Sequence, residues 1–513
     1  MPDAIVIGAG PNGLVAANRL ADAGWSVDVL EASSTPGGAV RTEELTEPGF
    51  RHDVFSAFYP LAAASPAIRS LELERHGLEW CHGPLVLAHP LPDGRCAVIS
   101  RDLDETAAAL DTFAAGDGDA WRELYRLWRR IEPHILRAMV TPTPAVRGTL
   151  GLLRELGGPK ALLRLARLGV LPVRRFAAEQ FDGDGAALLL AGNALHADFT
   201  PDTTLGGFFG LVLCGLGQHV GYPFPRGGAG ELTGALVERL ESRGGRVTCN
   251  AYVDRVIVRD RRAVGVHVRD GGDVSASRAV LADVDAPRLY LELVGADHLP
   301  SELVADLRRF QWDWATIKVD WALDGPIPWA AGDARRAPVI HVADSVDELT
   351  QTTAELHRGL IPEQPFLVLG QYSMGDATRA PAGKETAWAY THVSQRDRHE
   401  SELPEVVEKI ERRIEELAPG FRALVRERHV LGPSGLEERN PNLHGGAVNG
   451  GTAQLHQQLV FRPTPGLGRP ETPIRGLYLA SASAHPGGGV HGACGAIAAR
   501  AALRRGIAAV SRR

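Results

Sequence analysis

The N-terminal segment carries a strand, turn, helix and strand pattern that few folds can accommodate. In chain order it consists of the apolar run 4–7, the glycines Gly8, Gly10 and Gly13, a helix-like stretch over 14–23, and a second apolar run over 27–30. Glycines at this spacing permit a tight turn, the close approach of a pyrophosphate, and the packing of the helix on the strand. We therefore predict that the chain begins with a dinucleotide-binding βαβ unit.

Two further features of this unit indicate how the ligand is held. Pro11 and Asn12 lie at the start of the helix, where free N–H groups and a partial positive charge favour phosphate groups. Glu31 ends the second apolar run and Ala32 follows it, and a carboxylate at this place can accept hydrogen bonds from a ribose diol. We predict that these residues contact a dinucleotide. The alternative is a structural turn with no ligand.

A glycine pair followed by a cation comes shortly after Glu31. Pro36 precedes Gly37 and Gly38, and Arg41 follows them. Such a loop can fold back over a diphosphate, because Gly38 allows close approach and Arg41 adds positive charge. A second clamp suits a cofactor that stays bound through turnover, so the loop favours FAD over NAD. The alternative is an ordinary Pro-Gly turn.

A second glycine pattern lies near the end of the chain. Gly487, Gly489 and Gly492 formally repeat the Gly-x-Gly-x-x-Gly spacing and precede the helix-like stretch 493–505. Because the chain ends at Arg513, we expect no second strand and no ribose-binding acid after this helix. We predict instead that its N-terminus approaches the same cofactor from another direction and stabilises negative charge on the flavin.

Together these motifs resemble the flavoprotein superfamily of amine oxidases, protoporphyrinogen oxidases and carotenoid desaturases. Residues 222–232, 251–256 and 476–492 are most similar to the phytoene-desaturase-like group. The resemblance implies that FAD is the cofactor and that the backbone of Val253 touches adenine. It also implies that the C-terminal turn contacts the flavin through Gly487, Gly488, Gly489 and Val490, with His485 and His491 near its ring.

The order of these motifs predicts an α/β fold with two interleaved domains. Residues 1–90, 221–295 and 436–513 are expected to form a Rossmann-like FAD-binding domain of the glutathione-reductase type, as in the amine oxidase superfamily. Residues 91–220 and 300–435 are expected to form a mixed α+β domain that binds substrate and covers the flavin. The first of these two insertions is mostly helix-like, and the second contains strand-like runs.

Composition excludes several classes of partner and site. The net charge of −7 gives no reason to expect nucleic acid, and the chain has no apolar stretch long enough to span a bilayer. The N-terminus leads directly into the first strand, so we expect no leader peptide and a cytoplasmic location. The five cysteines are scattered without a Cys-x-x-Cys pair, which predicts neither a dithiol redox centre nor a zinc site. No metal site is expected.

Residues 146–176 are basic and amphipathic, with seven lysines and arginines against Glu155 alone. One interpretation is a peripheral contact with an anionic membrane surface through which a lipid-soluble substrate enters. The other is a helical lid whose leucines pack on the core while its arginines are solvated. We favour the lid.

The residues expected at the substrate are fewer. Trp388, Tyr390 and His392 alternate along a strand-like run and should share one face, where they could wall an apolar cavity or pack inside their own domain. His485 and His491 are the candidates for proton transfer, although each could instead cap its glycine turn. His196 and Asp198 form another polar pair, which helix capping explains equally well.

The sequence therefore predicts an FAD-dependent oxidoreductase that dehydrogenates, or desaturates, an apolar small molecule by hydride transfer to flavin N5. Oxygen, a quinone or another acceptor would then reoxidise the flavin. The first alternative is a redox-neutral isomerase or cyclase of a polyene. The second is a non-enzymatic escort protein of the same fold, which the intact glycine and acid motifs disfavour.

Overall fold

A five-stranded parallel sheet carries the N-terminal glycine turn. The computed structural model describes residues 1–142, 151–152, 154–156, 158–395 and 399–510. The strands, in the order β19-β13-β1-β2-β9, are β19 (Leu477–Leu479), β13 (Ala279–Ala282), β1 (Ala4–Ile7), β2 (Val27–Leu30) and β9 (Arg246–Thr248). All residues of β1 are buried, as expected of a central strand covered on both faces. Three distant parts of the chain thus build one sheet, which confirms the α/β prediction.

Both faces of this sheet are covered. On one face lie the helices α1 (Pro11–Asp22), α11 (Gly230–Ser242) and α17 (Ala493–Val510). On the other face lie an antiparallel sheet and a π-helical turn, namely β10 (Val253–Arg259), β11 (Arg262–Val268), β12 (Gly272–Ser275) and η2 (Arg288–Gly295). The helices α1 and α17 approach closely at Gly495, where a methyl group would lie 1.9 Å from the carbonyl oxygen of Asn12. The two glycine turns therefore begin adjacent helices.

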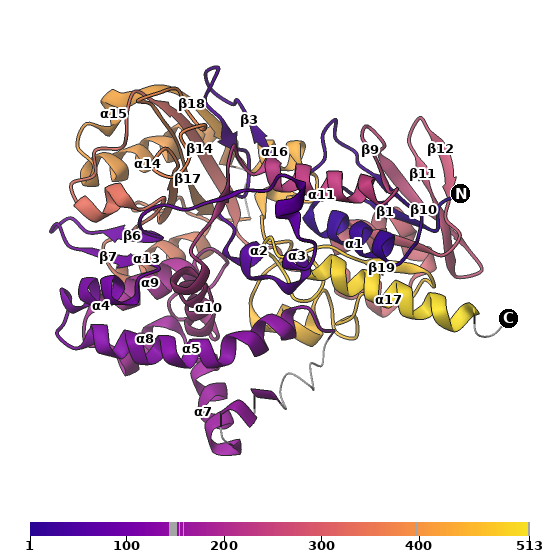
Figure 1. Cartoon of the computed structure of the whole chain (residues 1–513), viewed down its shortest axis with the longest axis horizontal. Helices are drawn as coiled ribbons and strands as arrows, with labels where there is room; N and C mark the ends of the chain where they lie inside the picture. Colours follow the sequence, from indigo (N-terminus) through magenta and orange to yellow (C-terminus); the bar gives the residue numbers. More distant parts are fainter. Residues whose placement is uncertain (143–150, 153, 157, 396–398, 511–513) are drawn as a thin grey trace.

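A seven-stranded mixed sheet forms the second body, to the left in Figure 1. In spatial order its strands are β18 (Val425–Leu431), β14 (Ala315–Leu323), β17 (Glu385–Val393), β16 (Leu367–Gln371), β15 (Val339–Val342), β6 (Leu87–Pro90) and β7 (Cys96–Ile99). The strand β6, which lies within residues 1–90, pairs with β15 of this sheet.

Helices surround the second sheet and fill the first insertion. These are α4 (Leu103–Asp111), α5 (Asp117–Met139), α7 (Pro159–Val170), α8 (Val173–Gln180), α9 (Asp184–Ala194), α10 (Gly206–Val220), α13 (Val346–His357), α14 (Leu403–Leu417), α15 (Phe421–Leu424) and α16 (Pro433–Arg439). The helix α12 (Ser301–Leu307) instead packs against η2 in the first body. The buried helices α9 and α10 pack side by side on the sheet, and α5 lies across α10. These three helices share one hydrophobic core with the seven-stranded sheet.

Short elements complete the described part of the chain. They are the helices α2 (Pro60–Ala64) and α3 (Pro66–Arg69), the ribbons β3 (Thr42–Glu43) with β4 (His52–Asp53) and β5 (Trp80–Cys81) with β8 (Phe224–Pro225), and the 3₁₀ turns η1 (Leu73–His76), η3 (Ala296–His298), η4 (Gly332–Arg336), η5 (His399–Glu402), η6 (His444–Gly446), η7 (Leu455–Gln457) and η8 (Leu459–Phe461). The ribbon of β3 and β4 reaches β17 in the second body.

Candidate functional site

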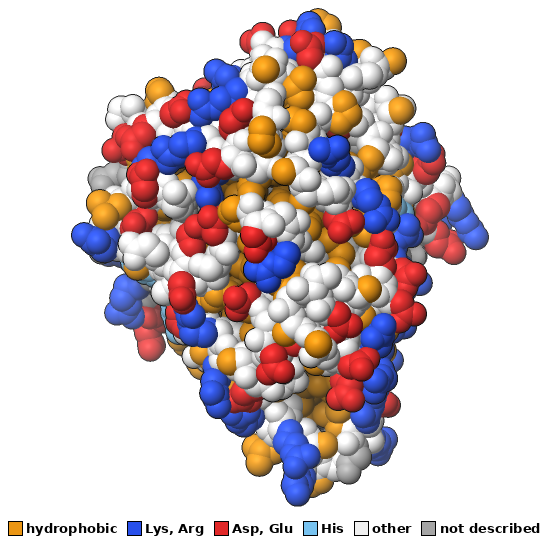
Figure 2. Space-filling view, turned by 90° about the vertical axis from the view of Figure 1, so that its left-hand side faces the viewer, with side chains coloured by type: hydrophobic (Ala, Val, Ile, Leu, Met, Phe, Trp, Pro, Cys, Tyr) orange, Lys and Arg blue, Asp and Glu red, His pale blue; other side chains and the backbone are white. Residues whose placement is uncertain are grey.

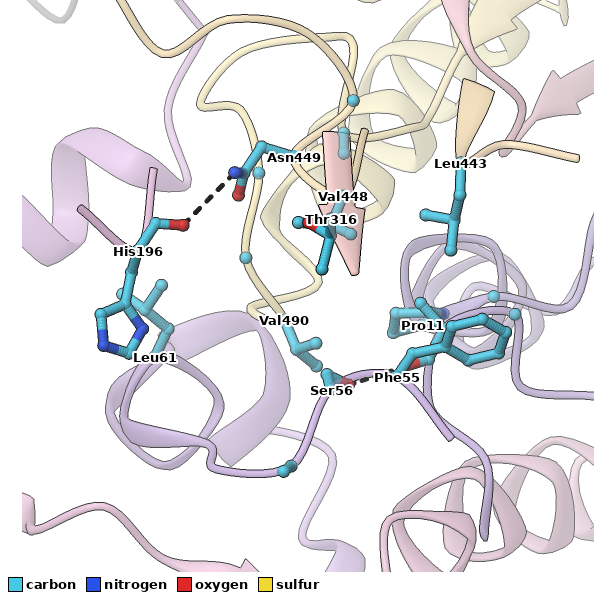
Figure 3. A pocket seen from close by; sticks show the side chains of 18 of the residues that line it. Pro11, Phe55, Ser56, Leu61, His196, Thr316, Leu443, Val448, Asn449 and Val490 are labelled. Carbon is cyan, nitrogen blue, oxygen red and sulfur yellow. Dashed lines mark hydrogen bonds between the residues drawn. The ribbon is translucent and has the colours of Figure 1, made fainter. Parts of the chain in front are cut away.

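One cavity runs from the N-terminal glycine turn to the second sheet. Its volume is about 330 Å³, and Figure 3 shows side chains from both bodies pointing into it. The predicted cofactor segments contribute Gly10, Pro11, Asn12, Gly38, Gly488, Gly489 and Val490. Most of the remaining lining is apolar, including Phe55, Phe58, Leu61, Leu213, Val339 and Val368. The structure therefore brings the three glycine segments and residues of the seven-stranded sheet to one cavity.

The glycine turn is shaped so that no side chain fits where the predicted ligand lies. Gly8 has a φ of +91°, in the left-handed region that favours glycine. A methyl group on Gly10 would lie 2.6 Å from Oδ2 of Asp283, and one on Gly13 would lie 2.2 Å from the carbonyl oxygen of Gly8. Gly38 in turn packs against Cα of Gly10. The two predicted glycine loops therefore meet and leave a bare backbone surface.

Glu31 is held in place by two backbone N–H groups. Its side chain is buried, with Oε2 accepting from the backbone N–H of Ala9 at 2.7 Å and Oε1 from that of Ser33 at 2.8 Å. Ala32 next to it is exposed. The backbone N–H of Ala251 donates to the carbonyl of Glu31, and this bond brings the start of β10, with the buried Val253, to the same edge. The carboxylate and the predicted adenine strand are thus neighbours.

Two buried polar atoms in the predicted cofactor-binding segments have no hydrogen-bond partner in the described part of the protein. Arg41 donates to the carbonyl of Arg439 at 2.9 Å and lies over the ring of Phe55, but its buried Nε has no hydrogen-bond partner. Oδ1 of the buried Asn12 also lacks one. Burial lowers the pKa of Arg41. Since buried polar atoms normally find partners, these orphans and the bare glycine surface fit an extended FAD diphosphate.

A buried lysine in the cavity wall was missed by the sequence analysis. Lys318 is 3% exposed, hydrogen-bonds to Asp320, and lies 5.6 Å from the ring centroid of Trp388. Burial lowers the pKa of Lys318, while Asp320 opposes this effect. His52 approaches the same carboxylate at 3.4 Å. The sequence feature that could have revealed this site is the pair of charged residues, Lys318 and Asp320, within the mostly apolar strand-like run 315–323.

The three aromatic residues predicted for the pocket divide into two groups. Trp388 and Tyr390 line the cavity, with rings 6.0 Å apart and nearly parallel. His392 donates Nε2–H to the carbonyl of Leu195 at 2.8 Å and is not among the residues lining the cavity. The alternation of the strand is as expected, but the end of β17 leaves the cavity before His392.

His485 and His491 lie in the C-terminal turn rather than in the cavity lining. His491 accepts from the N–H of Ala493 through Nδ1 and donates to the carbonyl of Gly487 through Nε2. His485 reaches the carbonyl of Ala138 at 3.4 Å. Burial lowers the pKa of His485 and takes that of His491 to about 4. This geometry favours the capping interpretation for His491, whereas His485 contacts the end of α5.

His196 does line the cavity, and a second histidine supports it. Its Nε2 lies 2.8 Å from Nε2 of the fully buried His341, so one ring donates and the other accepts. Asn449 donates to the backbone carbonyl of His196 at 3.4 Å (Figure 3). Burial lowers the pKa of His196 to about 4. Asp198 instead accepts from the N–H of Ala453 at 2.8 Å and positions the loop beside the cavity.

The basic segment 146–176 lies at the lower end of the molecule, where Figure 2 shows basic and hydrophobic side chains side by side. Positions 146–150, 153 and 157 fall outside the described residues. Arg167 and Arg175 pair with Glu179, and Arg174 pairs with Asp202 and Asp347. Leu163 is 71% exposed. Across the described ranges, no helix is both long and apolar enough to cross a membrane.

Comparisons with known proteins agree with this geometry. The model of a family described as flavin containing amine oxidoreductase matches residues 12–503. The mouse pyridine nucleotide-disulfide oxidoreductase domain-containing protein 2 is 31% identical, with 98% of this chain and 93% of the relative covered. One of the subunits of limonene dehydrogenase from Castellaniella defragrans is 23% identical (95% and 91% covered), and a neurosporene-forming phytoene desaturase of Rhodobacter capsulatus is 24% identical (96% and 91%).

Among solved structures, an oxidoreductase from Methanosarcina mazei superposes with a TM-score of 0.64 at 17% identity, covering 98% of this chain and 99% of that one. The likeness extends over both bodies, so it concerns the whole arrangement and not the nucleotide-binding sheet alone.

Proposed function

Because this chain belongs to the family of flavin-containing amine oxidoreductases and is an FAD-dependent oxidoreductase, we propose that it dehydrogenates an apolar small molecule. The observation that carries the proposal is the cavity, which is continuous from the glycine turn to a wall of aromatic and aliphatic side chains. The names of two relatives, limonene dehydrogenase and phytoene desaturase, refer to hydrocarbon substrates. A hydrocarbon needs a dry, shaped space more than it needs polar contacts.

FAD, when bound, supplies a two-electron acceptor that can take hydride from a C–H bond. The protein's part is to orient the substrate and exclude water. Trp388 and Tyr390 present parallel rings that can hold a flat unsaturated segment, and Phe58 packs 6.0 Å from the ring of Trp388. Lys318 supplies a positive charge that offsets negative charge developing in the cavity.

We expect replacement of Lys318 by methionine to make the flavin harder to reduce. The loss of a buried positive charge should lower the midpoint potential by on the order of 30 mV, equivalent to about 1.4 kcal/mol for a two-electron couple. Potentiometric titration of the purified flavoprotein measures this. Lys384→Met is the matched control, because Lys384 pairs with Asp324 outside the cavity lining. Equal midpoint potentials in Lys318→Met and wild type would show that Lys318 does not stabilise the reduced flavin.

For residues 146–176 we propose the lid rather than a membrane contact. Three of the arginines form ion pairs with Glu179, Asp202 and Asp347, which leaves a smaller free positive charge for anionic lipids. Leu165 and Leu171 are buried in the same core as α10, which contributes Phe209 and Leu213 to the cavity. The segment thus covers the side of the substrate space.

The proposed function is tested by finding which compound donates the electrons that reduce the flavin. Under anaerobic conditions, limonene or phytoene dispersed in detergent should bleach the visible flavin band of the purified protein. NADH and NADPH, added separately, should leave the band unchanged, because FAD occupies the dinucleotide seat that borders the cavity. Rapid bleaching by either nucleotide would contradict the proposal and indicate a reductase or monooxygenase.

A further inference from the structure

The carboxyl group of Asp283 lies beside the glycine turn at which we expect the pyrophosphate of FAD. Asp283 follows the last residue of β13, Ala282, at the carboxyl edge of the parallel sheet. Its Oδ2 accepts from the backbone N–H of Gly13 at 2.8 Å, and the group lines the cavity. The same oxygen is the atom that a methyl group on Gly10 would strike. Asp283 therefore borders the surface that the glycines keep bare.

The surroundings of Asp283 are unfavourable to a second negative charge. Glu31, at the end of β2, acts on it as a like charge. From α17 the group facing it is the thiol of Cys494, which stays neutral because burial raises its pKa to about 12. Asn442 donates to the backbone carbonyl of Asp283 at 3.0 Å, and Asp285 beside it is bonded to the N–H of Arg288.

Within the described ranges, no lysine or arginine forms an ion pair with Asp283. Burial, with a smaller contribution from Glu31, raises the pKa of Asp283 to about 7, although the hydrogen bond from Gly13 acts in the opposite direction. The pyrophosphate of FAD adds two negative charges at this place. An ionised Asp283 would repel it, whereas a neutral carboxylic acid has a proton to donate.

We propose that Asp283 is a cofactor-binding residue that acts in its protonated form. One carboxyl oxygen keeps the hydrogen bond from Gly13, and the other donates its proton to a pyrophosphate oxygen of FAD. Binding of FAD to the ionised apoprotein then takes up one proton from solvent. This inference depends on the cofactor and not on the substrate proposed above.

The dissociation constant of FAD provides the test. With an apoprotein pKa of about 7 for Asp283 and a higher one in the complex, affinity is full below pH 7 and declines above it. We expect FAD to dissociate with a Kd roughly 30-fold higher at about pH 8.5 than at about pH 6. The fluorescence of released FAD on dilution of the full-length holoprotein measures this ratio.

Asp283→Asn separates this explanation from others, because the amide keeps an acceptor for Gly13 and a donor for the phosphate but cannot ionise. Its Kd should change less than about threefold over the same range, because this side chain does not titrate. Glu31→Gln is the matched control, since it alters the other carboxyl of the site: it should weaken binding and keep a pH dependence, with the midpoint moved to lower pH because the like charge that helps raise the pKa of Asp283 is gone. A pH-independent Kd in wild type, or an unchanged dependence in Asp283→Asn, would overturn the proposal.

A second measurement covers the case in which Asp283→Asn fails to fold. Calorimetric titration of wild-type apoprotein with FAD, in buffers of different ionisation enthalpy, counts the protons taken up. With the pKa stated above, we expect uptake of about 0.9 proton at pH 8 and about 0.1 at pH 6. Uptake near zero at pH 8 would refute the inference without any variant.

Discussion

Replacement of Gly10 by alanine is expected to give a folded protein that purifies without flavin. The new methyl group would lie 2.6 Å from Oδ2 of Asp283, well inside van der Waals contact. It would also stand on the surface that Gly38 approaches, since a Cβ on Gly38 would lie 3.0 Å from Cα of Gly10. The diphosphate must approach this backbone directly. The loops of Gly10 and Gly38 therefore cannot move apart without disrupting the diphosphate-binding surface. The ratio of absorbance in the flavin band to protein absorbance measures the result.

Gly234→Ala is the matched control for this variant. Gly234 lies in α11, and a methyl group there meets no atom within 4 Å. Alanine is also the better helix former, so the control should keep its flavin and lose no stability. Circular dichroism of both variants separates loss of cofactor from loss of fold. A Gly10→Ala protein that retains a full complement of flavin would contradict the position assigned to the pyrophosphate.

Replacement of Arg379 by methionine is expected to lower the free energy of unfolding by about 3–5 kcal/mol, because it leaves a buried carboxylate without its cation. Arg379 and Asp53 are both fully buried, with Nη2 and Oδ2 at 3.0 Å. Asp53 also accepts from the hydroxyl of Tyr372 and from the N–H of Ala229. The pair thus joins the N-terminal ribbon to the second body. Chemical denaturation of the holoprotein measures the change.

Two further variants distinguish the ion pair from a general loss of packing. In Asp53→Asn with Arg379→Met the carboxylate is gone, so part of the lost stability should return. Arg426→Met removes a cation from an exposed pair with Glu47 and should leave the unfolding midpoint near that of wild type. A midpoint for Arg379→Met equal to that of wild type would show that the buried pair does not stabilise the folded protein.

The cofactor side of the site could be predicted from sequence because its requirements are local. The tight turn at Gly8 and the close approach at Gly10 depend on missing side chains, and such requirements show in a short stretch. The same is true of Gly38 and Gly488. Gly10, Gly38 and Gly488 all line the cavity, although hundreds of residues separate the last from the first two along the chain.

The residues that the sequence did not reveal owe their importance to contacts between distant parts of the chain. Asp283 is 270 positions from Gly13, to which it is bonded, and nothing in the sequence links the two. Lys318 and Asp320 stand two apart on one face of β14, but only the pairing of Lys318 with Tyr390 in β17 places that face at the cavity. His341 lies 145 positions from His196.

The aromatic alternation on β17 shows a different limit. A period of two predicts that Trp388, Tyr390 and His392 share a face, and all three are half-buried or buried. It does not predict where the cavity ends along the strand. The carbonyl of Leu195 occupies the position beyond Tyr390 and accepts from His392, so packing against the end of α9 determines the boundary.

The mass of the product formed from an apolar substrate tests the proposed dehydrogenation most directly. Limonene or phytoene is incubated with the holoprotein and an electron acceptor such as a quinone, and the product is analysed by mass spectrometry. The proposal predicts a product lighter than the substrate by two hydrogen atoms, formed together with the reduced acceptor. A product of unchanged mass would contradict it and identify a redox-neutral isomerase or cyclase.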